Sequence, residues 1–248
     1  MSEDSCSSEE GVADSVERGG GCLFLVGTPI GNREDLSPRA ARILAEADVI
    51  ACEDTRTSQA ILRPIGVSKP LVAYHEHNEI PQSATLADMV ASGKKVALIT
   101  DAGMPAISDP GFRVARECRR RGLRVVPIPG PTAALTALAA SGLPSDGFLF
   151  LGFLPAKTSA RRRVFEVYKD FSYTLVFYES THRIVVFIED LIAVLGTERT
   201  VCVAREITKL HETFYAGKAA EVLAALQKGS VKGEFVVMIA KNGYSLEG

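Results

Sequence analysis

Charged and hydroxyl-bearing side chains follow several apolar segments of this chain, at positions where they could bind a ligand or move a proton. The longest such stretch, residues 101–111, follows the apolar run 96–100 and contains Asp101, Ser108 and Asp109 among two glycines and two prolines. Glycine and proline favour an irregular backbone that can approach a ligand closely. A ligand-binding loop is one interpretation, and a long ordered turn whose aspartates cap the next helix is the other.

A second polar cluster, Glu53, Asp54 and Arg56, follows the apolar segment 48–52. A carboxylate there could accept a proton, and the guanidinium could grip a phosphate or carboxylate through paired hydrogen bonds. Helix capping by Asp54 is an equally good explanation. His75 and His77 follow the next apolar segment, but the third ligand of a metal site is missing, so we expect no metal.

Charged residues also follow two apolar segments in the second half of the chain. Charges at two neighbouring strand ends indicate a lined cleft, whereas isolated charges would indicate a solvated face. They are Glu179 and Arg183, after residues 174–178, and Arg205 and Lys209, after residues 200–204.

Apolar runs and helical patterns alternate along the chain, which predicts α/β architecture with a largely parallel sheet in the first half. In an open parallel sheet the carboxyl ends of the strands meet at one edge, so the polar clusters above should meet there. We predict two α/β domains, residues 22–142 and 148–248, with a linker at 143–147. The predicted strands span residues 22–26, 48–52, 71–74, 95–100, 124–128, 148–153, 174–178, 200–204 and 235–240; helices are predicted from Ser37 and over 57–62, 81–92, 112–121, 132–141, 183–195 and 219–227.

Composition limits the class of protein. The 248 residues are 46% hydrophobic with a formal net charge of −2, and no apolar stretch reaches the roughly 18 residues of a membrane span. Five separated cysteines suggest neither a zinc site nor a disulfide framework, so we expect a cytoplasmic protein. Residues 1–21, rich in Ser, Glu and Gly, are predicted to be a disordered acidic tail. The basic run 161–163 could meet phosphates or form a solvated helix end.

Two glycine-containing turns could bring backbone close to a ligand. Gly27 to Asn32 follows the first strand, but Pro29 removes an amide that a dinucleotide-binding fingerprint needs, so the turn is weak evidence of binding. Gly130 and Pro131 precede a helix of small residues whose free amides would admit a ligand, and close helix–sheet packing is the rival explanation.

Taken together, these stretches resemble the tetrapyrrole-methylase-like family of S-adenosylmethionine-dependent methyltransferases, and within it the branch that modifies ribosomal RNA. Any single stretch would be weak evidence for the family, whereas the order, number and residues of these stretches together are specific to it. The resemblance spans residues 23 to about 240 and rests on Val26-Gly27-Thr28-Pro29-Ile30-Gly31-Asn32, Cys52-Glu53-Asp54-Thr55-Arg56, His75-Glu76-His77-Asn78, residues 101–111, Pro129-Gly130-Pro131-Thr132-Ala133, Gly152-Phe153-Leu154-Pro155, Tyr178-Glu179-Ser180, His182-Arg183, Ala204-Arg205-Glu206 and Lys232-Gly233-Glu234.

The resemblance implies a homodimer of two-domain subunits with S-adenosylmethionine in the cleft between the domains. Many family members carry a further small helical domain beyond the position that matches Gly248, and without it the basic surface of the dimer would have to hold the RNA. By similarity, the cofactor should contact Pro29, Asp101, Met104, Thr132, Ala133, Tyr178, Ala204, Glu234 and Phe235.

The branch methylates the 2′-hydroxyl of a cytidine ribose in the decoding region of the 16S ribosomal RNA of the small subunit. The protein then has to align donor and acceptor and remove one proton, for which Glu179 or Glu53 is the expected base. A small-molecule tetrapyrrole C-methyltransferase and a non-catalytic ribosome-binding protein are the alternatives. The residues expected to hold RNA phosphates are Arg56, Arg183, Arg205 and Lys209.

Overall fold

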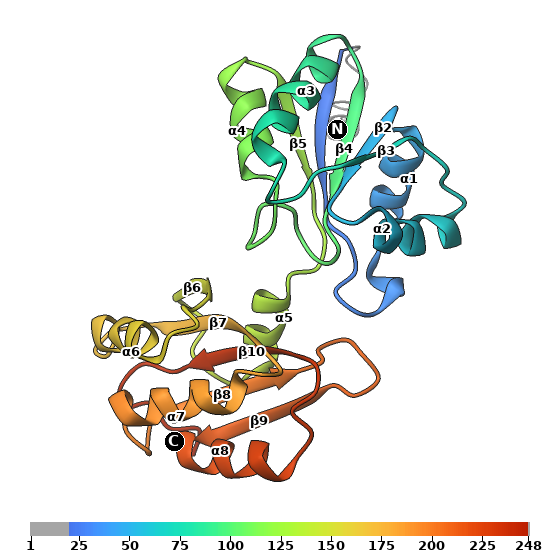
Figure 1. Cartoon of the computed structure of the whole chain (residues 1–248). Coiled ribbons are helices and arrows are strands. Elements are labelled where there is room, and N and C mark those ends of the chain that lie inside the picture. The colour runs from blue at the N-terminus through green and yellow to red at the C-terminus, as the bar shows by residue number, and fades with distance from the viewer. Residues whose placement is uncertain (1–19, 248) are drawn as a thin grey trace, which may run out of the picture.

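The computed structural model describes residues 20–247, which form two α/β units stacked on each other (Figure 1). The predicted acidic tail lies almost wholly outside the described residues. The first sheet is entirely parallel, with strand order β3-β2-β4-β1-β5. Its strands are β1 (Cys22–Val26), β2 (Val49–Cys52), β3 (Leu71–Ala73), β4 (Lys95–Ile99) and β5 (Arg124–Ile128).

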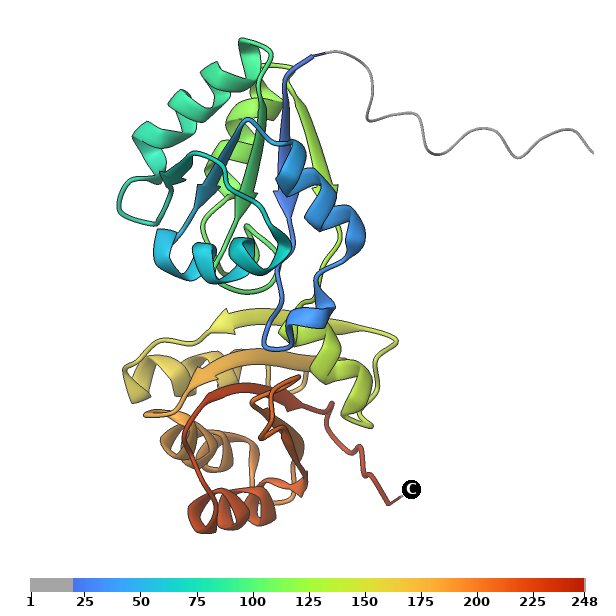
Figure 2. The same ribbon diagram turned by 90° about the vertical axis from the view of Figure 1, so that its right-hand side faces the viewer.

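Helices cover both faces of this sheet, which is why its central strands are apolar on both sides. The helices α1 (Pro38–Glu46) and α2 (Thr55–Leu62) pack on one face, while α3 (Glu79–Ala91) and α4 (Phe112–Arg120) pack on the other (Figure 2). Ser37 caps α1 by accepting a hydrogen bond from the Ala40 amide, and Asp54 caps α2 by accepting from the Arg56 amide. Capping is therefore one role of Asp54, as the alternative interpretation of its motif expected.

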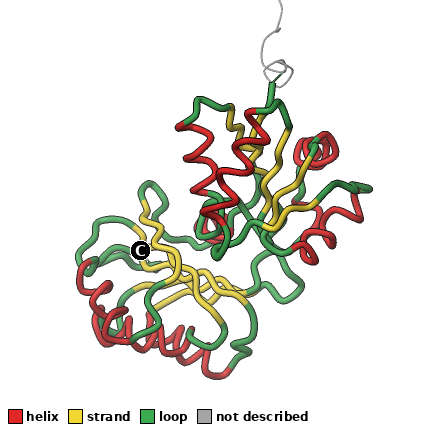
Figure 3. Tube along the Cα trace, turned by 45° about the horizontal axis from the view of Figure 1, so that its top comes forward, coloured by secondary structure: helices red, strands yellow, loops and turns green. Residues whose placement is uncertain are grey.

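The second unit is built on a mixed sheet with strand order β6-β7-β10-β8-β9. Only the β6–β7 pair is parallel. Three helices, α6 (Thr158–Val167), α7 (Ile184–Leu195) and α8 (Ala219–Lys228), cover one face of this sheet (Figure 3). The strands are β6 (Phe148–Phe153), β7 (Thr174–Ser180), β8 (Thr200–Arg205), β9 (Thr213–Lys218) and β10 (Glu234–Ile239).

The helix α5 (Ala133–Ala140) lies on the opposite face of the second sheet, although the predicted boundary at 142 assigns it to the first unit. Its small buried residues, Ala134 and Ala137, pack with Val176 and Ala204 of that sheet. The predicted linker 143–147 is also tied to the second sheet, because the Thr174 hydroxyl donates to the Pro144 carbonyl at 2.6 Å. The chain therefore crosses between the units before α5, and this helix packs with the second unit.

Two elements, α6 and β9, are absent from the sequence-based prediction. In α6 the buried guanidinium of Arg161 pairs with the buried carboxylate of Asp190 from α7, and Arg162 reaches the same carboxylate at 2.7 Å. The basic run therefore contains a structural ion pair, and two of its three arginines are engaged with α7. No helix within residues 20–247 is long and apolar enough to cross a bilayer.

Candidate functional site

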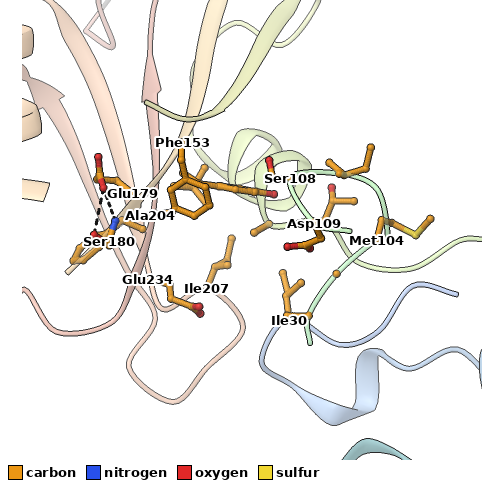
Figure 4. A pocket seen from close by; sticks show the side chains of 18 of the residues that line it. Ile30, Met104, Ser108, Asp109, Phe153, Glu179, Ser180, Ala204, Ile207 and Glu234 are labelled. Atoms are coloured by element: carbon orange, nitrogen blue, oxygen red, sulfur yellow. Dashed lines mark hydrogen bonds between the residues drawn. The ribbon is translucent and has the colours of Figure 1, made fainter. Parts of the chain in front are cut away.

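A cavity of about 260 Å³ opens between the two units and draws its walls from both (Figure 4). An adjoining hollow shares Ile30, Ala102, Lys209 and Glu234 with it and also contains Pro29 and Asp101. Nine residues that resemblance assigns to the cofactor thus lie around one continuous region. Seven of them line the first cavity: Met104, Thr132, Ala133, Tyr178, Ala204, Glu234 and Phe235.

The floor of the cavity is made by loops that follow β1, β4 and β5. Thr28 and Gly103 form an isolated antiparallel bridge with hydrogen bonds of 2.9 and 3.1 Å between their backbones. A Cβ placed on Gly130 would lie 2.7 Å from the Cα of Gly27, so two glycines are needed where these loops touch. The two glycine-containing turns therefore pack directly against each other.

The loop 101–111 reaches across to the second unit. Ala106 and Ser108 have positive φ angles of 71° and 62°, an uncommon conformation for residues other than glycine. The Ala106 amide donates to the Pro110 carbonyl at 3.2 Å, which closes the loop on itself. A Cβ on Gly152 of β6 would come within 2.9 Å of Ser108 Oγ, so the loop packs directly against the second sheet.

Three carboxylates influence one another at this end of the cavity. The Asp54 amide donates to Asp101 Oδ1 at 3.3 Å, which ties the end of β2 to the end of β4. Burial and then the charge of Asp101 raise the pKa of Glu53, and burial also raises the pKa of Asp101 itself. Burial, followed by the charges of Glu53 and Asp101, raises the pKa of Asp109 to about 7. The sheet edge thus gathers acids from β2, β4 and the following loop.

An aromatic wall from the second unit faces these acids. The Tyr178 ring meets Phe150 and Phe153 edge to face, with centroids 4.9 and 5.6 Å apart. Its hydroxyl accepts a hydrogen bond from the Ala134 amide at 3.3 Å, and burial raises its pKa. Aromatic faces beside small residues suit a flat heterocycle with polar edges.

Glu179 lies next to this wall, but its side chain is completely buried. Its carboxylate accepts from the Ser180 amide at 2.7 Å and pairs with Arg183 at 3.0 Å. Arg183 also donates to the Leu154 carbonyl at 2.6 Å. Both predicted site residues are therefore engaged inside the second unit.

The other residues predicted to hold phosphates differ in how exposed their charged groups are and in whether these groups are already paired. Arg205 is buried and donates to the carbonyls of Lys232 and His211, so it fixes the loops of its own unit. Lys209 lines both hollows but bridges Glu206 and Glu234 at 2.9 and 2.7 Å. Arg56 is exposed at the start of α2. Of the four, Arg56 has the most accessible charge.

The His75–Asn78 motif forms a turn before α3. The Asn78 side chain accepts from the His75 amide at 2.8 Å and donates to the Ala73 carbonyl at 3.0 Å. Within residues 20–247 no group of three or more His, Cys, Asp or Glu side chains is arranged to hold a metal ion. The two hydrogen bonds of Asn78 shape the chain between β3 and α3.

Several cavity residues were not predicted as site residues. Asp109 and Ser108 belong to the loop 101–111, but neither is predicted to contact the cofactor or to act as a base. Ile30, Phe153 and Ile207 contribute apolar surface. Resemblance to a family identifies only those residues that match its motifs. The other cavity residues could be identified only from the folded structure, in which the loop 101–111 lies against β6.

Comparison with known proteins places this geometry in a family. Residues 22–223 match the profile of the tetrapyrrole (corrin/porphyrin) methylases. The ribosomal RNA small subunit methyltransferase I of Escherichia coli O157:H7 is 45% identical over 227 residues, covering 91% of this chain and 79% of that protein. The protein of the same name from Haemophilus influenzae is 48% identical, covering 88% and 78%. That of Thermotoga maritima is 41% identical, covering 89% and 98%.

Solved structures agree on the fold. The methyltransferase CobJ superposes with a TM-score of 0.65 at 17% identity, covering 90% of this chain and 95% of its own. The uroporphyrin-III C-methyltransferase of Thermus thermophilus gives a TM-score of 0.60 at 23% identity, covering 89% and 94%. With its two α/β units and its inter-unit cavity, this chain belongs to the tetrapyrrole (corrin/porphyrin) methylase family, within the group of the ribosomal RNA small subunit methyltransferases I.

Proposed function

We propose that this methyltransferase uses S-adenosylmethionine to methylate the 2′-hydroxyl of a cytidine ribose in the 16S ribosomal RNA of the small subunit. The observation that carries the proposal is the inter-unit cavity, which is lined by the motifs that this chain has in common with that branch. Relatives at 41–48% identity bear the name of a ribosomal RNA methyltransferase, whereas the structures of tetrapyrrole methyltransferases are only 15–23% identical. The higher similarity favours RNA as the substrate.

The residues around the cavity fit the cofactor. Tyr178, Met104 and Phe235 offer apolar and aromatic surface for its adenine, and Asp101 in the adjoining hollow offers a carboxylate for hydroxyl or amino groups. The Thr132–Ala133 segment opens α5 with small side chains that leave room for a ligand. Bound there, S-adenosylmethionine would supply a methyl group already activated as a sulfonium.

The protein must then remove a proton from the acceptor hydroxyl. Glu53 suits this role better than Glu179, because the Glu179 carboxylate is buried and paired with Arg183. Glu53 lies at the end of β2, and burial raises its pKa, which makes its ionised form a stronger base. Glu53 lies beside Asp101, which borders the adjoining hollow, and this favours an acceptor ribose at the rim of that hollow.

We infer that RNA phosphates contact Arg56 and the rim near Lys209, and that the protein acts in the cytoplasm as a homodimer. Arg56 is exposed next to the Glu53 end of β2, so a phosphate held there would bring its ribose towards the base. Sedimentation at the monomer mass under assay conditions would contradict the dimer.

The test is transfer of labelled methyl from S-adenosylmethionine to small ribosomal subunits from cells that lack this protein. The modified RNA is digested to nucleosides and the label is identified. We expect label in 2′-O-methylcytidine from unmodified subunits, and none in subunits from cells that contain the protein. Label in another nucleoside would contradict the acceptor assignment.

Absence of RNA label together with demonstrated cofactor binding would favour a small-molecule acceptor of the tetrapyrrole type. Binding to subunits without cofactor binding would favour a non-catalytic ribosome-binding protein. Both free RNA and assembled subunits should be offered, because the preferred form of the substrate is part of the result.

A further inference from the structure

The carboxylate of Asp109 lines the cavity and has no hydrogen-bond or ion-pair partner among the residues that the structure describes. The residue is half-buried on the loop between β4 and α4, and it lines the cavity together with Met104 and Tyr178. Among residues 20–247, no side chain or backbone amide donates a hydrogen bond to this carboxylate or forms an ion pair with it. Burial of a carboxylate without a hydrogen bond or an ion pair favours its neutral, protonated form.

None of the charged groups that face Asp109 in the described structure stabilises its ionised carboxylate. Glu53 from the end of β2 and Asp101 from the end of β4 are both acids, and both raise its pKa. Tyr178 of β7 presents a neutral ring and hydroxyl, and its own pKa is raised in turn by burial and by the charge of Asp109. Lys209 is the cation that lines the cavity, and it is already bridged to Glu206 and Glu234. The loop end of the cavity is therefore anionic.

The backbone on both sides of Asp109 is held in uncommon conformations. Ala106 and Ser108 adopt left-handed conformations within three residues of it, and Gly111 follows at φ 144°. A Cβ on Gly111 would lie 2.9 Å from the Ala106 amide nitrogen, so the turn is tightly closed. Strain of this kind persists only where the surrounding structure fixes it, which is common at ligand sites.

We propose that Asp109 is the counter-ion for the positive charge in the methionine half of S-adenosylmethionine. The inference rests on the proposed function, since it concerns the same cofactor. The methionine half carries a sulfonium and an ammonium group. Either cation would place a positive charge next to the Asp109 carboxylate, which no described residue of the protein does. A carboxylate in this mostly apolar cavity would therefore favour the cationic donor.

A proton balance follows from this arrangement. With a pKa of about 7, Asp109 is protonated in about half of the molecules at pH 7 before the cofactor binds. A bound cation favours the carboxylate, so the carboxyl group of Asp109 passes its proton to the buffer as the ion pair forms. Binding should thus release up to about half a proton per site at pH 7, and affinity should fall by about tenfold per pH unit below the pKa of the free site.

The experiment is titration calorimetry of the full chain with S-adenosylmethionine alone, without RNA, between pH 5 and 7. Measurements in two buffers of different ionisation enthalpy give the number of protons released. The variant Asp109→Asn keeps the shape of the side chain and removes its charge. The matched control is Asp146→Asn, because Asp146 is an exposed aspartate outside both hollows.

We expect Asp109→Asn to bind S-adenosylmethionine about 10- to 100-fold more weakly at pH 7, the effect of losing one charge-assisted contact. Its proton release should largely disappear, and its affinity should depend less on pH. Asp146→Asn should behave as the parent. Titration with S-adenosylhomocysteine, which lacks the sulfonium, identifies the cation: a loss confined to S-adenosylmethionine assigns the sulfonium, and an equal loss for both assigns the ammonium.

Equal affinity of the parent and Asp109→Asn for S-adenosylmethionine would overturn the inference, and so would binding without proton release by the parent between pH 6 and 7. Unchanged binding together with slower methyl transfer would instead make Asp109 a base for the acceptor. Failure of the parent chain to bind S-adenosylmethionine at all would contradict the proposed function, so the two failures are distinguishable. The parent's own pH profile tests the idea even if the variant folds poorly.

Discussion

Two glutamates that looked equivalent in the sequence occupy different environments. Glu179 has no exposed side-chain surface and holds Arg183 within its own unit. Glu53 is half-buried at the end of β2, beside Asp101. A base must be ionised and accessible to its substrate; the Glu53 side chain is partly exposed and in no ion pair among the described residues, whereas that of Glu179 is buried and paired with Arg183. Residue type and position in a motif are thus insufficient to assign a base.

Replacement of Glu53 by Gln should lower the methyl-transfer rate by about 10²- to 10⁴-fold, the usual contribution of a general base. The parent rate should fall as pH drops through the raised pKa of Glu53, because the base is then protonated. Single-turnover transfer to small subunits over a pH series measures both effects.

The control for this variant is Glu189→Gln on the exposed side of α7, which should keep the parent rate and pH profile. Binding of S-adenosylmethionine should change little in Glu53→Gln. If Glu53→Gln kept the parent rate, Glu53 would not be the base, and Asp109 would be the next carboxylate to test in that role.

At the scale of elements, a buried ion pair joins α6 to α7. Arg161 donates through Nε to Asp190 at 2.8 Å, and it also donates to the carbonyls of Pro155 and Ala156. Arg162 approaches the other oxygen of the same carboxylate. The network thus holds α6 and the turn after β6 against α7, and removal of one partner leaves a buried charge unpaired.

The change Asp190→Ala should reduce the free energy of unfolding by about 3–5 kcal/mol, because the guanidinium of Arg161 would stay buried without its carboxylate. Urea unfolding at neutral pH measures the loss. Asp170→Ala, at an exposed position of the same unit, should cost little and serves as the control. A small effect at Asp190 would mean that Arg161 can reach water when its partner is removed.

The whole molecule is organised around the contact between its two units. The Asn32 amide donates to Thr208 Oγ1 at 3.1 Å, and Ser108 packs against Gly152. The main cavity lies in the same interface and takes residues from both sides. A ligand bound there contacts both units at once and therefore stabilises their association.

Saturation with S-adenosylmethionine at 100 times its dissociation constant should stabilise the chain by about 2.7 kcal/mol. Because the cavity belongs to both units, we expect both to unfold in one transition that moves to higher temperature. Differential scanning calorimetry with and without cofactor shows this directly. Two separate transitions, of which the cofactor moves only one, would contradict a site shared between the units.

The sequence by itself determined most of the local elements and the motifs that identify the family. Alternating apolar runs and helical patterns are local signals, so strands such as β1 and β5 and the cap at Ser37 could be read directly. The elements α6 and β9 were not predicted from the sequence, since the buried Arg161 interrupts the apolar pattern of α6 and Gly217 weakens that of β9. Resemblance to a family assigned the residues that the structure places around the two hollows.

Tertiary structure alone decided which charges are free. The engagement of Glu179 with Arg183, of Arg205 with distant carbonyls and of Arg161 with Asp190 depends on segments far apart in the chain. The same holds for α5, whose small residues could pack on either sheet but lie on the second. Asp109 gains its importance because folding places it beside two acids and, within residues 20–247, gives its carboxylate no hydrogen-bond partner. Burial and pairing are relations between distant residues, and periodicity along a sequence carries no record of them.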